Sequence, residues 1–305
     1  MTARPSASNI VIDDVRKTYG DLRAVDGVSF GVGTGEFFGI LGPNGAGKTT
    51  TLEIIEGLRS PDSGSVSLLG RSPWPRNREL LPRIGVQLQA SAFFERLTAR
   101  EQIRTFASLY GVGTTSGDAW LARVGLDDKG DTQTSKLSGG QLQRLSIACA
   151  LVHEPEVVFL DEPTAGLDPQ ARRNLWDLLS SLNDDGRTVV LTTHYMDEAE
   201  MLCDRVAIMD KGSILELDSP TALIRALDAA VRISIAPNVL ALADARQVDG
   251  VDAASADDSS LTMTTRDPAA VMSDLARRGA LTGLQVRGAT LEDVFLTRTG
   301  REYRA

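Results

Sequence analysis

The sequence predicts an α/β protein with a mainly parallel sheet covered by helices. Continuous apolar patterns typical of strands, such as "FFGIL", "VVFLD" and "TVVLTT", alternate with helical patterns such as "ARRNLWDLLSSL". Parallel strands are buried on both faces and need helical crossovers between them, so this alternation favours that fold class. The chain of 305 residues is long enough for one large domain and a smaller one.

Composition excludes several classes of protein. With 32 Lys and Arg against 41 Asp and Glu, the formal net charge is -9 and no basic run is present, so nucleic acid is disfavoured as the main partner. The two histidines exclude a His-rich metal site. Cys149 and Cys203 each lie among apolar neighbours and are predicted to be buried, reduced thiols.

Neither a membrane span nor a secretory signal is predicted. No run approaches the roughly 18 apolar residues that a span needs. The opening "MTARPSASN" lacks the apolar core of a signal. We therefore expect the chain in the cytosol unless a partner holds it at a membrane.

Strands dominate the beginning of the chain. "NIVIDDVRKTYG" and "AVDGVSFGVG" alternate as strands broken by Gly and Asp turns. "FFGIL" then runs into the glycine loop "GPNGAGKTT", and "KTTTLEIIEGL" continues with helical periodicity to Gly57. A short strand, "GSVSLLG", follows a Pro-Asp-Ser-Gly turn.

The pattern becomes mostly helical from about Ala90 to His153. Thr98 and Glu101 form a capping box for "AREQIRTFASLYG", "DAWLARVGL" is a second helix, and "SGGQLQRL" opens a third. Strands and helices then alternate again, from "EVVFLDEP" to the strand pair "RVAIMDKGSILEL".

The composition changes once more after "DSPTALIRAL", to an Ala- and Asp-rich stretch without lysine. "VRISI", "SLTMTT" and "LTGLQVRG" alternate as strands, whereas "DPAAVMSDLARRG" and "TLEDVFLTRTGREYR" are helical. We predict that residues 228–305 form a separate small α/β domain.

The glycine loop predicts phosphate binding. It matches GxxxxGK[ST] between a strand and a helix, a context in which backbone N–H groups point at phosphates, the lysine reaches the β and γ phosphates and the hydroxyl binds Mg²⁺. The predicted binding residues are Gly42, Pro43, Asn44, Gly45, Ala46, Gly47, Lys48, Thr49 and Thr50.

Two adjacent carboxylates predict the metal-binding and basic groups of the same site. Asp161 stands at the carboxyl end of a buried strand, which suits a Mg²⁺ shell of one or two carboxylates with water and phosphate oxygens. Glu162 points differently and is placed to orient and deprotonate a water.

Further spaced motifs resemble the ATP-binding subunits of ABC transporters over about residues 10–217. Tyr19 stands where those proteins stack an aromatic ring on adenine. Gln89 stands at their loop glutamine, which senses Mg²⁺ and γ-phosphate, and His194 at their switch histidine. "AGLD" places Asp168 in the loop after the two carboxylates. "LSGGQ" is the family signature, formed here by Leu137, Ser138, Gly139, Gly140 and Gln141.

Alternatives stay open at several positions. Tyr19 could be a core aromatic, and His194 on its own a structural histidine. Gln87 competes with Gln89, although the spacing from "RIG" favours Gln89. His153 lacks such a context and is predicted to be structural.

The resemblance implies a P-loop NTPase (RecA-like) core at residues 1–89 and 154–227, with N-terminal antiparallel strands and an inserted α-helical subdomain at residues 90–153. It also implies that two copies sandwich two ATP molecules head to tail, with Mg²⁺. Ser138, Gly139 and Gly140 would stabilise charge on the γ-phosphate held by the other copy. Glu162 would polarise the attacking water and His194 would hold the γ-phosphate.

Longer segments resemble a narrower group. "GPNGAGKTTTLEIIEGL", "PTAGLDPQARR", "HYMDEAEMLCDRVAIMDKG" and "TLEDVFLTRTGRE" are similar to the daunorubicin and doxorubicin resistance ATPases of ABC-2-type exporters. This resemblance implies an ATPase at the cytoplasmic face of the membrane, held there by separately encoded permease subunits. The expected cargo is a drug, antibiotic, lipid or glycan moved outward.

Other functions are weighed against an exporter. An importer shares the same chemistry, whereas a soluble ABC-type ATPase acting on nucleic acid or ribosomes usually has two cassettes or a long coiled coil, and neither is present. Glu162 and His194 disfavour a non-hydrolysing binding module. Phe93 and Phe94 are candidates for binding a permease helix or for anchoring the helical subdomain, and the "LEDVF" helix for a permease or dimer contact or for packing on its own small sheet.

Overall fold

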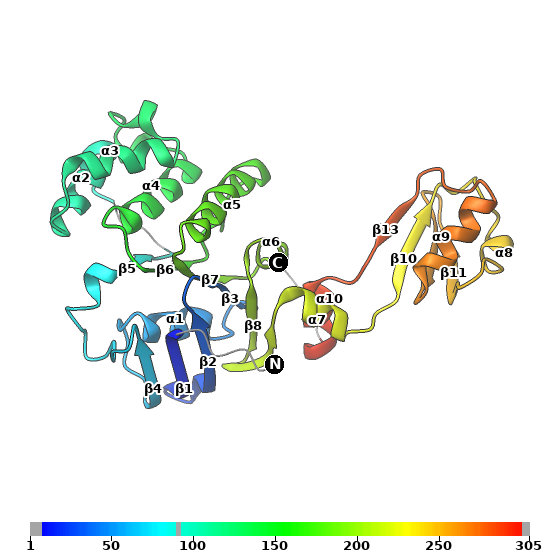
Figure 1. The fold of residues 1–305 in the computed structure, drawn as a ribbon, viewed down its shortest axis with the longest axis horizontal. Helices are drawn as coiled ribbons and strands as arrows, with labels where there is room; N and C mark the ends of the chain where they lie inside the picture. Colours follow the sequence, from blue (N-terminus) through cyan, green and yellow to red (C-terminus); the bar gives the residue numbers. More distant parts are fainter. Residues whose placement is uncertain (1–7, 90–92, 301–305) are drawn as a thin grey trace. The chain divides into compact units, whose positions relative to one another are not determined.

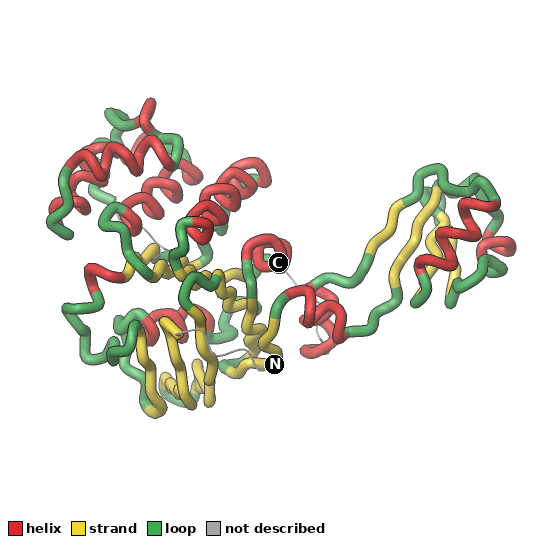
Figure 2. The backbone as a smooth tube through the Cα atoms, in the orientation of Figure 1, coloured by secondary structure: helices red, strands yellow, loops and turns green. Residues whose placement is uncertain are grey.

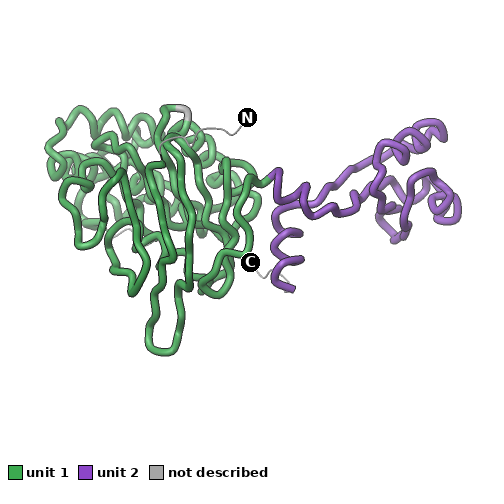
Figure 3. Tube along the Cα trace, turned by 60° about the horizontal axis from the view of Figure 1, so that its bottom comes forward, with its two compact units in different colours: residues 1–220, 304–305 green, residues 221–303 purple. Residues whose placement is uncertain are grey.

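Two units make up the described residues, 8–89 and 93–300, of this computed structural model (Figure 1). The first unit extends to Pro220 and the second begins at Thr221 (Figure 3). The boundary expected at residues 227/228 falls after the short helix α7 (Pro220–Ala226), whose residues from Thr221 onward group with the second unit. The expected start of the helical subdomain at Ala90 lies outside the described residues.

A six-stranded sheet forms the centre of the first unit. Its order is β5-β6-β7-β3-β8-β9, and every neighbouring pair is parallel except β8 with β9. Strands β3, β6 and β7 are buried along their whole length, as their apolar sequences predict. The predicted mainly parallel sheet is confirmed. The strands are β3 (Phe37–Leu41), β5 (Ile84–Gln87), β6 (Val157–Asp161), β7 (Thr188–Thr193), β8 (Arg205–Asp210) and β9 (Ser213–Asp218).

A second, antiparallel sheet comes from the N-terminal segment. It has the order β2-β1-β4, formed by β1 (Ser8–Tyr19), β2 (Leu22–Gly33) and β4 (Ser63–Leu68). Buried residues of both sheets and of helix α1 (Lys48–Ile55) share one core cluster, in which the rings of Phe30 and Phe38 stack with centroids 4.9 Å apart. This shared core fixes the glycine loop between the two sheets.

Three helices form the inserted helical subdomain, which Figure 2 shows grouped at one end of the first unit. They are α2 (Ala99–Leu109), α3 (Thr114–Arg123) and α4 (Gly139–Leu151). The first unit also has 3-10 turns at Leu81–Arg83, before β5, and at Asp127–Lys129 and Thr134–Lys136. The predicted capping box of α2 is confirmed, because Glu101 N donates to Thr98 Oγ1 at 3.2 Å and Thr98 N donates to Glu101 Oε2 at 2.8 Å.

Strand β5 was not predicted. It has only four residues and contains Gly85, where a Cβ would lie 2.2 Å from the carbonyl oxygen of Ala150. The strand exists because it pairs with β6, which is distant in the sequence, and a short local pattern carries no signal for such pairing.

The helices α5 (Pro169–Asp184) and α6 (Met196–Leu202) follow strands β6 and β7. Asp168 caps α5, its carboxylate accepting hydrogen bonds from Gln170 N at 3.0 Å and Ala171 N at 2.9 Å. The loop after β6 leads into α5, and the loop after β7 leads into α6.

The second unit is a small α/β structure built on an antiparallel sheet of order β11-β12-β10-β13. Its core includes Ile233, Met263, Val271 and Leu275, from the sheet and from helix α9. Strand β11 and the single-turn helix α8 were not predicted, and the last predicted helix ends at Thr299, before residues outside the described range. The elements are β10 (Val231–Ile235), α8 (Leu242–Ala245), β11 (Ala253–Ala256), β12 (Leu261–Thr265), α9 (Pro268–Arg277), β13 (Gln285–Arg287) and α10 (Leu291–Thr299).

Within the described residues, no helix has the length and apolar character needed to cross a membrane.

Candidate functional site

The glycine loop follows β3 directly and leads into α1. Gly47 has φ +101°, and a Cβ there would lie 2.2 Å from the carbonyl oxygen of Ala24. A Cβ at Gly42 would lie 2.2 Å from the carbonyl oxygen of Met209. Both positions therefore exclude side chains, and the backbone can wrap tightly with its N–H groups available to an anion.

Lys48 is buried at the start of α1 and extends back over the loop. Its Nζ donates to the carbonyl oxygens of Gly42 at 2.9 Å and Pro43 at 3.3 Å, and lies 3.2 Å from Glu162 Oε1. The ammonium is thus held at the place where the loop and the strand-end carboxylates meet.

Oxygen ligands suited to a hard cation converge beside this lysine. Thr49 Oγ1 donates to Asp161 Oδ1 at 3.2 Å, and the Thr192 hydroxyl donates to the same oxygen. Burial raises the pKa of the Asp161 carboxyl, and the hydrogen bonds from Thr192 and Thr49 lower it in part.

This donor set fits Mg²⁺. The described residues contain no group of three or more His, Cys, Asp or Glu that would enclose a metal. Magnesium is usually bound by one or two carboxylates together with water and phosphate oxygens, and Thr49 and Asp161 match that requirement.

Three other predicted site residues, Lys48, Gln89 and His194, meet at Glu162. Its Oε2 lies 3.3 Å from Gln89 Nε2 and 3.3 Å from His194 Nδ1, while its Oε1 faces Lys48. The imidazole is within ion-pair range but makes no aligned hydrogen bond to the carboxylate. Glu162 also has φ +47°, an uncommon conformation for a non-glycine residue that recurs at functional sites.

The two glutamines have different surroundings. Gln87 is buried in β5 and donates to the carbonyl oxygen of Leu88 at 2.6 Å. Gln89 is exposed and reaches Glu162. The structure therefore brings Gln89, and not Gln87, to the carboxylate.

Tyr19 is 40% exposed, which does not match a core aromatic. Arg59 Cζ lies 5.4 Å and Lys17 Nζ 5.7 Å from its ring centroid. The ring is therefore an accessible aromatic surface beside two cations. The sequence did not indicate that Lys17 and Arg59 lie beside it.

The signature residues form a second cleft. Ser138 caps α4, with Gln141 N donating to Ser138 Oγ at 3.3 Å and Ser138 N donating to Gln141 Oε1 at 2.9 Å. The cleft has a volume of about 350 Å³, and its lining includes Ser138, Gly139, Gly140, Gln141 and Asp168. The first residues of α4 line this cleft and place the positive end of the helix dipole beside it, which suits an anion.

Three further residues singled out in the sequence lie elsewhere. His153 Nε2 is 2.9 Å from the carbonyl oxygen of Ile84, and its ring stacks on Tyr110 with centroids 3.7 Å apart, as expected of a structural histidine. Cys149 and Cys203 are free and buried, and burial raises the pKa of both thiols.

Sequence reasoning missed Thr192, whose hydroxyl donates to Asp161. The signal was present, because Thr192 is a polar residue at the carboxyl end of an apolar strand, and it pairs in register with Asp161 on the neighbouring strand. Only the strand order makes the two residues neighbours.

Comparisons with known proteins identify the family of this chain. The model of the ABC transporter family matches residues 25–165. The Nod factor export ATP-binding protein I of Burkholderia orbicola (strain AU 1054) is 40% identical over 302 residues, which cover 97% of this chain and 99% of that protein. The same protein of Paraburkholderia xenovorans (strain LB400) is 41% identical over 96% of this chain and 97% of its own length.

Solved structures show the same fold. A dimeric ATP-binding cassette in a post-hydrolysis state with ADP and Pi is 29% identical, with a TM-score of 0.63 over 69% of this chain and 98% of its own. The chain belongs to the ATP-binding subunits of ABC transporters and is an ATPase of that family. The P-loop core, the antiparallel N-terminal sheet and the helical subdomain predicted for it are confirmed.

Paired substitutions test the choice between the two glutamines. We expect Gln89→Ala to lower ATP turnover about 10- to 100-fold, the usual effect of losing a group that supports a metal site. Gln87→Ala should instead lower the free energy of unfolding by roughly 1–3 kcal/mol, because a buried polar contact is lost. Steady-state ATPase assays and urea unfolding of both variants measure this. A loss of turnover in Gln87→Ala alone would reverse the assignment.

Proposed function

We propose that the chain is the ATP-hydrolysing subunit of an ABC exporter, and that hydrolysis takes place at Glu162. The observation that carries this proposal is the contact of one carboxylate with Lys48, Gln89 and His194. These groups come from three distant segments, and together they provide a cation, a neutral donor and an imidazole around a potential base.

The phosphate-binding roles follow from the loop. The backbone of Gly42 to Thr50 would bind the β and γ phosphates, with Lys48 between them. Thr49 and Asp161, with Gln89 nearby, would hold Mg²⁺, which supplies charge neutralisation on the phosphate oxygens. Tyr19 would stack on the adenine.

Water activation falls to Glu162. Its carboxylate is placed to accept a proton from a water beside the γ-phosphate, and Gln89 orients it. His194, whose Nδ1 lies near the same carboxylate oxygen as Gln89, would hold the γ-phosphate and keep the attacking water in line.

A second copy would complete the site. Charge on a transferred phosphoryl group is often met by an arginine, and the motifs of this chain assign none to that role. We propose that Ser138, Gly139, Gly140 and Gln141 of the other copy supply this charge stabilisation, with Asp168 beside them. The dimeric cassette among the similar solved structures supports this arrangement.

Export is proposed on the relatives and on the sequence motifs. Both relatives described above are named as Nod factor export proteins, and longer motifs resemble the daunorubicin and doxorubicin resistance group. The ATPase would act at the cytoplasmic face of the membrane through separately encoded permease subunits. Phe94, which is 66% exposed just after Gln89, is a candidate contact for a permease helix.

The domain roles follow from this proposal. Residues 1–89 and 154–227 would form the nucleotide-binding core, and residues 90–153 the subdomain that presents the signature to the other copy. Residues 228–305 would be an accessory domain. Its α10 carries the "LEDVF" motif, in which Leu291, Val294 and Phe295 are buried.

Removing the carboxylate tests the catalytic assignment. We expect Glu162→Gln to bind ATP and to lose on the order of 10² to 10⁴ in turnover, the usual contribution of a general base. Glu95→Gln, a matched change at an exposed glutamate, should keep wild-type turnover. Near-normal turnover of purified Glu162→Gln would refute the assignment.

A bulky cation in the signature cleft tests the proposed dimer. We expect Ser138→Arg, made in the Glu162→Gln background so that ATP persists, to bind ATP and remain monomeric because the side chain fills the cleft. Ser135→Arg adds the same charge at an exposed position that does not line the cleft and should still dimerise. Light scattering with and without ATP measures this, and ATP-dependent dimers of Ser138→Arg would count against the model.

Transport direction can be measured in inside-out membrane vesicles that contain the chain and its permease. An exporter should accumulate doxorubicin, a labelled lipid or a labelled glycan inside the vesicles when ATP is added outside. The Glu162→Gln variant serves as the control without hydrolysis. ATP-driven loss of compound from preloaded vesicles would identify an importer instead.

A further inference from the structure

We propose that Arg172 and Tyr195 form a stacked pair that positions the imidazole of His194 against Glu162. This inference rests on the proposed role of His194 in hydrolysis. Both residues lie within segments of the sequence resemblance, "PTAGLDPQARR" and "HYMDEAEMLCDRVAIMDKG", but neither was assigned a role there. The pair would act on Glu162 only through the ring of His194. Both are therefore positioning residues.

The first contact is between neighbouring side chains. The rings of His194 and Tyr195 have centroids 4.1 Å apart and planes inclined by 40°. His194 Nδ1 lies 3.3 Å from Glu162 without an aligned hydrogen bond, and Nδ1 has no hydrogen-bond partner in the described part of the chain. The orientation of the imidazole thus depends on what packs against its ring.

The second contact holds Tyr195 from the opposite helix. Arg172 Cζ lies 3.8 Å from the centroid of the Tyr195 ring, well within the roughly 6 Å over which a cation is attracted to an aromatic face. Its Nε is buried and has no hydrogen-bond partner among the described residues, and its one ion pair, with Asp197, is long at 4.0 Å. The aromatic ring is therefore the main partner of this guanidinium.

Arg172 also lies one helical turn after a residue of the signature cleft. Arg172 N donates to the carbonyl oxygen of Asp168 at 2.9 Å, in the first turn of α5. Asp168 itself lines the signature cleft. A continuous series of contacts therefore runs from that cleft through Arg172 and Tyr195 to His194 and Glu162.

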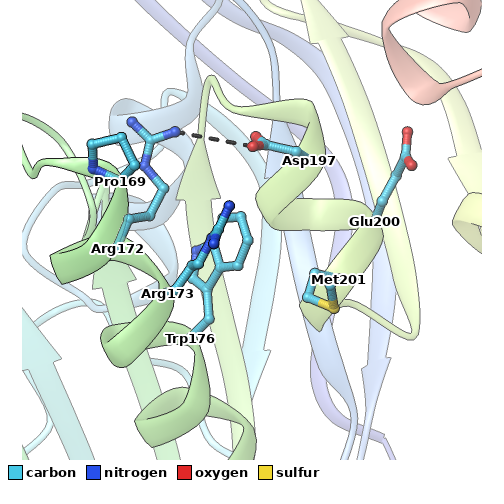
Figure 4. A pocket seen from close by; sticks show the side chains of 7 residues that line it. All are labelled: Pro169, Arg172, Arg173, Trp176, Asp197, Glu200 and Met201. Atoms are coloured by element: carbon cyan, nitrogen blue, oxygen red, sulfur yellow. Dashed lines mark ion pairs between the residues drawn. The ribbon is translucent and has the colours of Figure 1, made fainter.

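A separate hydrogen bond holds the two helices together without the stack. Trp176 Nε1 on α5 donates to Glu198 Oε1 on α6 at 3.1 Å, and Glu198 is fully buried. Figure 4 shows Arg172, Arg173 and Trp176 on α5 across a groove from Asp197, Glu200 and Met201 on α6. Because this bond remains, loss of the stack should alter the His194 ring more than the packing of the helices.

A double-mutant cycle on the full chain tests the proposal. Tyr195→Ala and Arg172→Met are each made alone and in the His194→Ala background, and hydrolysis of labelled ATP is followed over hours so that slow variants are measured. We expect each single change to lower kcat roughly 10-fold, as a misplaced catalytic group does, with KM for ATP within about 2-fold. In the His194→Ala background the same changes should add less than about a 2-fold loss.

Conservative variants separate positioning from a general structural effect. Tyr195→Phe keeps the ring and should restore kcat to within about 2-fold of wild type. Asp197→Asn removes the long ion pair but keeps an oxygen that can accept from Glu198 N, and should leave kcat within about 2-fold of wild type. Thermal unfolding of every variant shows whether the fold persists.

The outcomes distinguish the two proposals. Equal multiplicative losses with and without His194 would overturn the positioning role, as would full turnover of both Tyr195→Ala and Arg172→Met. Full turnover of His194→Ala itself would overturn the proposed role of His194 and the positioning role with it.

Discussion

The site depends on one constraint, which is that parallel strands end at the same edge of a sheet. β6 lies beside β7, and β7 beside β3, so that Asp161 pairs with Thr192 and Leu41 with Thr193. The loop after each strand then begins at the same place. Lys48, Glu162 and His194, which are far apart in the sequence, meet there because the sheet order makes the ends of β3, β6 and β7 neighbours.

Lys48 balances the charge of Glu162 within one chain, whereas the residues proposed to stabilise the γ-phosphate from the other copy lie in the signature cleft. Lys48 and Glu162 form a buried ion pair, and a buried pair is stabilising only when both partners are present. The signature cleft lies on other loops and offers a helix N-terminus and small residues to an anion. The proposed chemistry therefore includes a second copy, and helix α5 would link the two sites because Asp168 caps it and it carries Arg172.

The second unit lies outside the part of the chain that the family model matches. The matched family model covers residues 25–165, and the similar solved cassette covers 69% of the chain. The relatives named for export align over almost the whole chain, 97% in one case. The second unit therefore falls within the likeness to those relatives, and it has a core of its own around Ile233 and Met263.

Local sequence determined the elements whose signal is local. The capping box at Thr98, the glycine loop and the apolar strands were predicted because helix caps, close backbone approach and burial leave their marks within a few residues. The fold class followed from the alternation of those elements. The residues of the site were named from the motifs, and the structure brings Lys48, Gln89, Glu162 and His194 together.

Tertiary structure decided what depends on distant partners. Strand β5 forms only by pairing with β6, and the burial of Gln87 in that strand leaves Gln89 to reach Glu162. The bond from Thr192 to Asp161 and the stack of Arg172 on Tyr195 likewise join segments that share no local pattern. The sequence specifies which side chains are present. Their contacts depend on strand order and helix packing, which no short stretch of the sequence determines.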